Sequence, residues 1–194
     1  MAQRRIEQGE LDELVRKHKL WLEGEDGGER LALVNCNLSR SNLSGSNLSG
    51  SDLSGSDLSG SDLSWSDLSG SDLSRSDLSG SDLSGSNLSR SNLSRSNLSG
   101  SNLSWSNLSR SDLDYSVLPL WCGSLKANFD DKQLIQIAYH LVRAGLNSDN
   151  ASNETKTELE KLIGFANKFH RVDECGKIYP VTKKIAVNQK ENEE

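Results

Sequence analysis

Four side chains near the carboxyl end of the sequence have the chemistry of a zinc site. Cys122, His140, His170 and Cys175 could supply the thiolate and imidazole ligands that structural Zn²⁺ accepts. Their spacing is not that of a zinc finger, because the sequence has no C-x2-C pair and no H-x3-H pair. Cysteines packed in a core, and histidines bonded to neighbours, are the interpretation that we favour. The sequence therefore assigns no metal ligand, and a zinc-binding or protein-binding C-terminal module is kept as an alternative.

The other reactive side chains form no recognisable catalytic set. There is no Ser-His-Asp order, no glycine-rich phosphate loop and no pair of carboxylates that a cleft would hold. Most aspartates belong to a repeat that predicts a convex surface, whereas catalytic sites are usually concave. We therefore predict no catalytic residue, no cofactor-binding residue, no cofactor and no enzymatic activity.

The secondary structure that positions these residues is determined by a repeat with a period of five residues. A leucine occupies every fifth position from Leu33 to Leu118, eighteen in all, within the unit Ser-Asn/Asp-Leu-Ser-X, where X is mostly glycine. A period of five makes no stripe on an α-helix and alternates faces along a straight strand. The leucines can share one buried face only if the chain bends within each unit, and glycine at X tolerates the positive φ of a tight bend. The unbroken phase argues against the disordered tract that the Ser/Gly/Arg composition alone would suggest.

Units such as residues 51–55, Ser-Asp-Leu-Ser-Gly, resemble the pentapeptide-repeat family, whose pattern is A-(D/N)-L-x-x. The resemblance covers residues 31–120. It implies a β-solenoid, namely a right-handed quadrilateral β-helix with four pentapeptides per coil. Serine here takes the place of the family's inward-pointing alanine. Because an unpaired buried hydroxyl costs roughly 1–3 kcal/mol, we expect each serine from Ser41 to Ser116 to bond to a carbonyl or to a serine of its own column.

Four pentapeptides per coil would stack equivalent side chains on top of one another. The expected neighbours are Trp65 and Trp105 with Gly85 between them, Arg75 with Arg95, Arg90 with Arg110, Asp57 with Asp77, and Asp62 with Asp82. We expect the Asp and Asn side chains to bond to local backbone at the turns, and the tryptophans to form at most a small patch for weak self-contact. The near-identity of consecutive units is typical of an engineered consensus repeat.

The sequences on either side of the repeat predict a helical cap for each end of the solenoid. Residues 1–30 predict a capping helix and loop, with Leu11, Leu14, Val15, His18, Trp21 and Leu22 at helical spacing. Pro119 would end the ladder. Residues 121–182 predict two helices, the first with a capping box at Asp130 and Gln133 and an end at Gly145. Caps would cover the strand edges that otherwise invite aggregation, and residues 183–194 predict a flexible tail.

The C-terminal helices are expected to be amphipathic. The first would bury Leu134, Ile135, Ala138, Leu141 and Val142, and the second would bury Leu159, Leu162, Ile163, Ala166 and Phe169. We expect a monomer, with a weak dimer through these helices as the alternative.

The composition of the sequence restricts the kinds of partner that we expect the protein to bind. The net charge is −6, and residues 31–120 carry 5 basic against 9 acidic side chains, so we predict no nucleic-acid binding through phosphates. No apolar run is long enough for a membrane span, and no signal region precedes the repeat, so we predict no membrane partner and a cytoplasmic protein. Three distant cysteines do not suggest a disulfide framework.

These observations favour a structural repeat scaffold, designed and without a native ligand. The alternative comes from the resemblance, because some pentapeptide-repeat proteins are DNA mimics that bind a topoisomerase such as DNA gyrase. An acidic rod of duplex-like width motivates that alternative, although arginines and tryptophans interrupt its faces. Ice or surface binding by a flat Ser/Asn lattice is the weakest of the three hypotheses.

Overall fold

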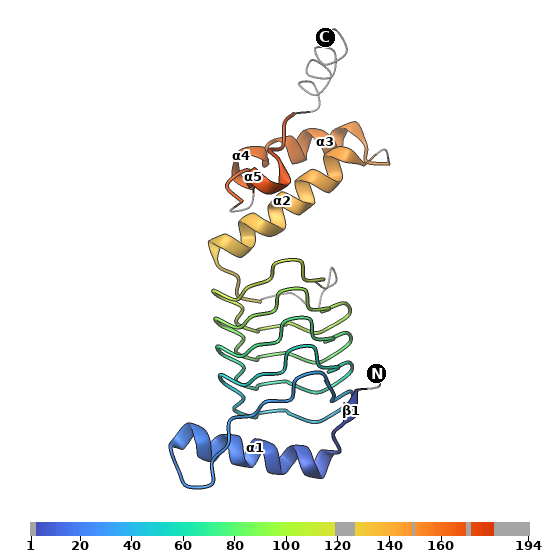
Figure 1. Cartoon of the computed structure of the whole chain (residues 1–194). Helices are drawn as coiled ribbons and strands as arrows, with labels where there is room; N and C mark the ends of the chain where they lie inside the picture. Colours follow the sequence, from blue (N-terminus) through green and yellow to red (C-terminus); the bar gives the residue numbers. More distant parts are fainter. Residues whose placement is uncertain (1–2, 119–126, 149, 170–171, 181–194) are drawn as a thin grey trace. The chain divides into compact units, whose positions relative to one another are not determined.

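The structure is a computed structural model that describes residues 3–118, 127–148, 150–169 and 172–180. The chain divides into two units, Met1–Phe129 and Asp130–Glu194. Each unit has its own hydrophobic core, and Figure 1 draws the first as stacked coils with one helix and the second as helices. None of the helices in the described ranges combines the length and apolar composition needed to cross a bilayer.

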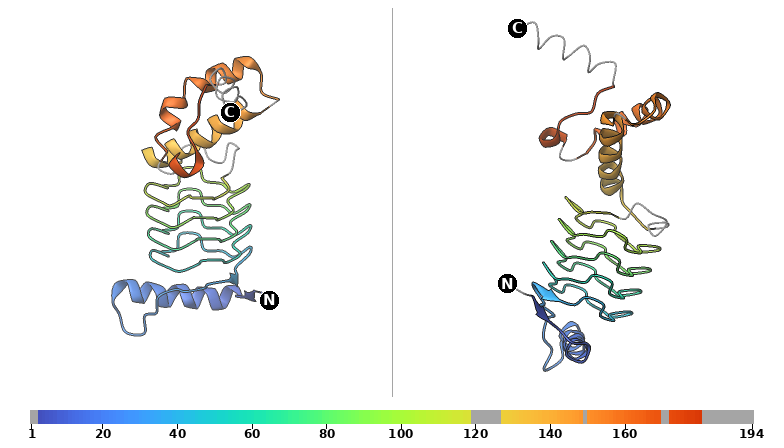
Figure 2. Two further views of the ribbon diagram at one scale, coloured as in Figure 1. Left: turned by 45° about the horizontal axis from the view of Figure 1, so that its top comes forward. Right: turned by 90° about the vertical axis from the view of Figure 1, so that its right-hand side faces the viewer.

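The repeat winds into coils of twenty residues. Parallel bridges join Asp57 to Asp77 and Asp77 to Asn97, and the same step of twenty recurs from Ala32 to Val117. Four pentapeptides therefore make one coil, as the sequence predicts. Figure 2 shows the coils stacked in parallel.

Backbone hydrogen bonds between successive coils replace the continuous strands of an ordinary sheet. The Leu58 amide donates to the Asp77 carbonyl at 2.7 Å, and the Gly60 amide donates to the Ser79 carbonyl at 2.9 Å. The Asp77 amide in turn donates to the Ser56 carbonyl at 2.9 Å. Because this set recurs unit after unit, the polar backbone of the interior coils is satisfied although each pairing is only one residue long.

Each corner is a tight turn with a left-handed residue at X. The Ser61 amide donates to the Leu58 carbonyl at 3.1 Å, and Gly60 between them has φ +64°. This pattern is that of a type II turn, which needs positive φ at its third residue. Trp65 and Arg75 occupy the same position with φ +59° and +60°, and each such non-glycine residue costs about 1–2 kcal/mol.

The interior of the solenoid is a column of leucine side chains lined by serine. Leu38 and every repeat leucine from Leu48 to Leu108 are fully buried. The serine hydroxyls mostly bond back to the carbonyl of the leucine three residues earlier, as Ser76 does to Leu73 at 2.6 Å. The expected serine–carbonyl bond is confirmed at these positions, but the expectation that every serine is paired is wrong at Ser51. Its buried hydroxyl has no hydrogen-bond partner in the described part of the chain.

Helix α1 (Gln8–Glu23) lies against the first coil, as Figure 1 shows. Leu11 is buried in the leucine core, and Gln8 exchanges two hydrogen bonds with the backbone of Asn42, at 2.8 and 2.9 Å. The preceding strand β1 (Arg4–Arg5) pairs in parallel with β2 (Cys36–Asn37). Gly24, with φ +72°, follows the last residue of the helix.

The packing of the solenoid continues beyond residue 120. Asn128 bridges to Asn107, and Ala127 and Phe129 pack against the leucine core. Pro119, which the sequence places at the end of the ladder, lies outside the described residues.

The second unit contains four helices in the described ranges: α2 (Asp131–Asn147), α3 (Asn153–Glu160), α4 (Ile163–Ala166) and α5 (Val172–Cys175). The predicted capping box of α2 is confirmed, since the Asp130 carboxylate accepts from the Gln133 amide and the Gln133 side chain accepts from the Asp130 amide, both at 3.0 Å. The predicted end at Gly145 is wrong by two residues, because the helix continues to Asn147.

Two other expectations for these helices are wrong. The single second helix is divided into α3 and α4, and Leu162 at the break is 41% exposed. In α2, the expected burial is confirmed at Val142 but is wrong at Leu134 and Leu141, which are exposed. The buried face instead carries Tyr139, whose hydroxyl donates to the Gly176 carbonyl at 2.6 Å. Tertiary packing therefore buries a face of α2 that is shifted by one residue from the face that apolar composition favours.

Candidate functional site

Of the four residues with zinc chemistry, only His140 has a described side chain. Cys122 and His170 lie outside the described residues, and the side chain of Cys175, at the end of α5, is likewise not described. The His140 ring meets Tyr139 and Phe169 edge-on, with centroid separations of 5.5 and 5.6 Å. Within the described ranges no three His, Cys, Asp or Glu residues gather to hold a metal ion. His140 therefore acts as an aromatic packing residue.

His18 ties α1 to the solenoid. Its Nδ1 accepts a hydrogen bond from the Leu31 amide at 3.0 Å, and its Nε2 lies 3.2 Å from the Ser49 carbonyl. The ring is fully buried and stacks on Trp21, whose own side chain is 41% exposed rather than on the buried face as expected. Burial lowers the pKa of His18, and the Ser49 carbonyl only partly opposes that shift. His18, which the sequence places at helical spacing with the apolar residues of the predicted helix, is therefore buried and bonded to the coil.

Cys36 is the described cysteine, and it is buried. Burial raises the pKa of its thiol, so the thiolate is disfavoured. Its Sγ donates weakly to the Val34 carbonyl at 3.6 Å. This cysteine packs as a small apolar residue and does not present a nucleophile.

The Asp and Asn side chains cap the turns, as expected. The Asp57 carboxylate accepts from the Ser59 amide at 2.9 Å. In the later coils, asparagine amides also reach one coil back, as Asn97 does to the Asp77 carboxylate at 3.2 Å. In the earlier coils aspartate lies on aspartate, as in the pair Asp57 and Asp77.

Trp65 and Trp105 share one face, two coils apart, with exposed fractions of 73% and 63%. The Trp65 ring lies over Gly85, where an added Cβ would come within 2.6 Å of the ring. A glycine is therefore required between the tryptophans, and the indole covers backbone of the next coil.

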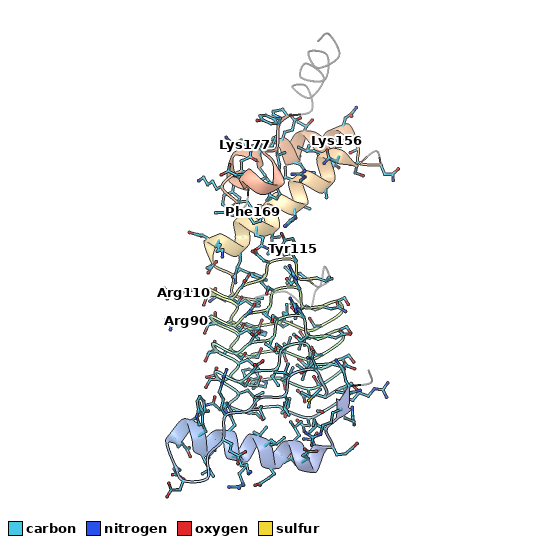
Figure 3. The ribbon with its side chains drawn as sticks, viewed as in Figure 1. Arg90, Arg110, Tyr115, Lys156, Phe169 and Lys177 are labelled. Atoms are coloured by element: carbon cyan, nitrogen blue, oxygen red, sulfur yellow. The ribbon has the colours of Figure 1, made fainter. Side chains whose placement is uncertain are left out.

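A hollow in the described surface runs beside Arg90 and Arg110. It is a shallow groove of about 630 Å³, and its lining residues are Ser69, Gly70, Asn87, Ser89, Arg90, Asn107, Ser109 and Arg110. Figure 3 shows the two arginines one above the other on the same side of the solenoid. None of the described lining residues is acidic.

The second pair of stacked arginines has different surroundings. Above Arg95, the Tyr115 ring lies 5.7 Å from the guanidinium carbon, a cation–π contact. Asp72 belongs to the same pentapeptide as Arg75, and Asp114 follows in the coil above Arg95. The Arg95 guanidinium therefore lies over an aromatic ring, whereas the side chains that line the groove beside Arg90 carry amide and hydroxyl groups.

The sequence predicts both arginine pairs but not the groove. The groove forms where Gly70, without a side chain, lies one coil below Arg90 and two below Arg110. The signal that distinguishes this face is found when residues twenty positions apart are compared, including the neighbouring Asn87 and Asn107. The contact between Arg95 and Tyr115 could have been found in the same way.

The model of the family described as pentapeptide repeats matches residues 36–75 and 76–114 with eight copies. No curated protein matches the chain. Among solved structures, a pentapeptide repeat protein from Nostoc Pcc 7120 is 26% identical, with a TM-score of 0.44, and the match covers 59% of this chain and 93% of that one.

Two further structures are similar over about half of the chain. A pentapeptide repeat protein, Rfr23, from the cyanobacterium Cyanothece 51142 is 30% identical, with a TM-score of 0.36 and coverage of 51% and 60%. Full-length QnrB1, a plasmid-mediated fluoroquinolone resistance protein, is 18% identical, with a TM-score of 0.32 and coverage of 58% and 71%. From the repeated unit, its step of twenty residues and the family match, residues 36–114 belong to the pentapeptide-repeat family and form a four-sided β-solenoid.

Proposed function

We propose that the protein is a non-catalytic structural scaffold, a consensus-type β-helix with helical caps. The observation that carries the proposal is the unbroken stack of buried leucines from Leu48 to Leu108 beneath a regular hydrogen-bonded ladder. Such a stack stabilises a rod and leaves its outer surface free to vary. The near-identity of the units supports a designed origin.

The amino-terminal cap is supported by contacts of α1 with the first coil. Leu11 enters the leucine core, Leu14 and Val15 pack against it, and Gln8 and His18 bond to the coil backbone. These contacts occupy an edge that would otherwise present unpaired amides and carbonyls. Capping repeats or helices are generally needed to keep solenoids from associating end to end.

A single substitution tests the cap. We expect Leu11→Asp to detach α1, because a carboxylate in the leucine core would be buried without a partner. The exposed first coil should then pair with other molecules, so sedimentation velocity should show association that grows with protein concentration. Glu13→Ala, on the exposed side of the same helix, is the matched control and should leave the sedimentation coefficient unchanged. A Leu11→Asp protein that sediments as the parent does at all concentrations would contradict the capping role.

Mimicry of DNA is the second candidate, favoured by a belt of acidic side chains. Seven consecutive units, from Asp52 to Asp82, carry aspartate, and three pairs of aspartates lie one above another. In a DNA gyrase supercoiling assay, inhibition at micromolar or lower concentration, lost in an Asp57→Asn, Asp77→Asn double variant, would support mimicry. We expect no inhibition from a scaffold. If the variant inhibits as strongly as the parent, the inhibition does not depend on these carboxylates.

A further inference from the structure

The end of α1 and the loop that follows it form one packed segment, residues 17–30, which we call the helix-end segment. The Glu29 amide donates to the Lys17 carbonyl at 3.1 Å, and the two side chains form an ion pair at 2.8 Å. A Cβ added to Gly28 would clash with the backbone of Trp21, so the loop lies directly on the helix. The helix end and the loop are therefore held to each other by contacts that do not involve the first coil.

Three hydrogen bonds join the helix-end segment to the first coil in the described structure, and two of them belong to His18. Its Nδ1 accepts from the Leu31 amide, so Nε2 carries the proton and donates to the Ser49 carbonyl at 3.2 Å. The third bond runs from Arg30 Nε to the Gly50 carbonyl at 2.6 Å. The beginning of α1 is held separately, by strand β1 and by the contacts of the first helical turns.

The charged groups around the His18 ring, within the described residues, offer no counter-charge to a protonated imidazole. On the helix and the loop, the Glu29 carboxylate is already paired with Lys17. On the second coil, the Asp52 carboxylate accepts a hydrogen bond from the backbone of its own turn. Burial is the main cause that lowers the pKa of His18, and the positive charge of Arg30 adds to it. The site therefore favours a neutral ring.

We propose that His18 is a pH-sensitive latch, which holds the helix-end segment to the first coil while its ring is neutral and releases the segment when the ring is protonated. Protonation places a second N–H at Nδ1, where it faces another donor, the Leu31 amide, across 3.0 Å. Release brings the imidazolium into water. It also uncovers the Leu31 amide and the Ser49 carbonyl, edge groups of the kind that pair with other chains. The latch rests on the capping role proposed for α1.

Release is a local opening, because the ladder of the solenoid and the first turns of α1 keep their contacts. In the released segment His18 meets water and titrates near pH 6.5. Its pKa in the docked segment is lower, so the released state takes up a proton that the docked state does not as the pH falls through about 6.5. The population of the released state should consequently rise up to about tenfold between pH 7.5 and pH 5.5.

Amide hydrogen exchange of the full chain, followed by NMR from pH 7.5 to pH 5.5 and in low concentrations of urea, tests the latch. The reporters are the amides of residues 19–22 and of Leu31, because a released helix end this short is not stable alone. After correction for intrinsic exchange, we expect their protection to fall up to about tenfold on acidification, with little dependence on urea. The Leu73 amide should depend steeply on urea, because it exchanges through global unfolding.

The matched variants are His18→Gln and His140→Gln. Glutamine keeps one donor and one acceptor but takes up no proton, so His18→Gln should lose the pH dependence, and His140→Gln, in the second unit, should keep it. Protection that does not change with pH, a urea dependence equal to that of Leu73, or an unchanged pH dependence in His18→Gln would each overturn the latch. Reporters that are unprotected already at pH 7.5 would contradict the cap itself. The urea dependence is measured in the parent, so the test does not require His18→Gln to fold.

Discussion

Replacing Leu73 with alanine is expected to lower the free energy of unfolding by about 2–5 kcal/mol. Leu73 is fully buried and lies in the middle of the column, between the leucines of the coils on either side. The ladder holds those coils at a fixed spacing, so the leucines above and below cannot close the cavity. The cost should therefore lie toward the upper end of that range.

Urea or guanidinium unfolding, followed by circular dichroism, measures this effect as a change in midpoint at unchanged slope. Leu73→Met is the matched control, because it conserves volume and should cost less than about 1.5 kcal/mol. A Leu73→Ala midpoint equal to that of the parent would refute the inward-facing column. Leu113→Ala, at a leucine that is already 5% exposed, should cost less than Leu73→Ala.

The architecture of the solenoid follows from the sequence because each of its rules is local. A leucine at every fifth position demands a bend within each unit, and glycine or another left-handed residue at X makes that bend. The chain confirms this at Gly60 and at Arg75, which have nearly the same φ. The coils can then stack without further sequence signals, because identical units placed one above another satisfy one another's backbone hydrogen-bonding groups.

The second unit could be predicted only in outline. A capping box is a local interaction, so Asp130 and Gln133 identify the start of α2 correctly. The buried face is decided by contacts distant in sequence, for instance the bond from Tyr139 to Gly176. Similarly, the groove beside Arg90 depends on Gly70, which lies one coil away. Sequence reasoning reaches such features only when residues are compared across the coil period.

The second large effect is expected for His18→Ala, which should lower the free energy of unfolding by about 2–4 kcal/mol. The substitution leaves the buried Leu31 amide without its acceptor, which alone costs roughly 1–3 kcal/mol. It also removes the contact with Ser49 and leaves a void where the ring stood. Chemical unfolding at pH 7.5 measures the loss. His140→Ala, which removes an exposed histidine, is the control and should cost less.

Stability should also depend on pH through this residue. Burial lowers the pKa of His18 in the folded protein, whereas in the unfolded chain it stays near 6.5. As pH falls through about 6.5, the unfolded chain therefore takes up a proton that the folded chain does not, and the free energy of unfolding decreases by up to about 1.4 kcal/mol per pH unit. The loss continues until the pH reaches the lowered pKa of the folded state.

The hydrogen bonding of the His18 ring also predicts that stability decreases as the pH falls. Nδ1 must be unprotonated to accept from the Leu31 amide, so the imidazolium cannot keep this bond. Unfolding free energies measured from pH 7.5 to pH 5 in the parent and in His18→Gln test the linkage. Glutamine keeps one donor and one acceptor but takes up no proton, so the difference between the two proteins should shrink as the pH falls. A difference that stays constant, or that grows toward acid, would show that His18 is not held neutral between α1 and the first coil.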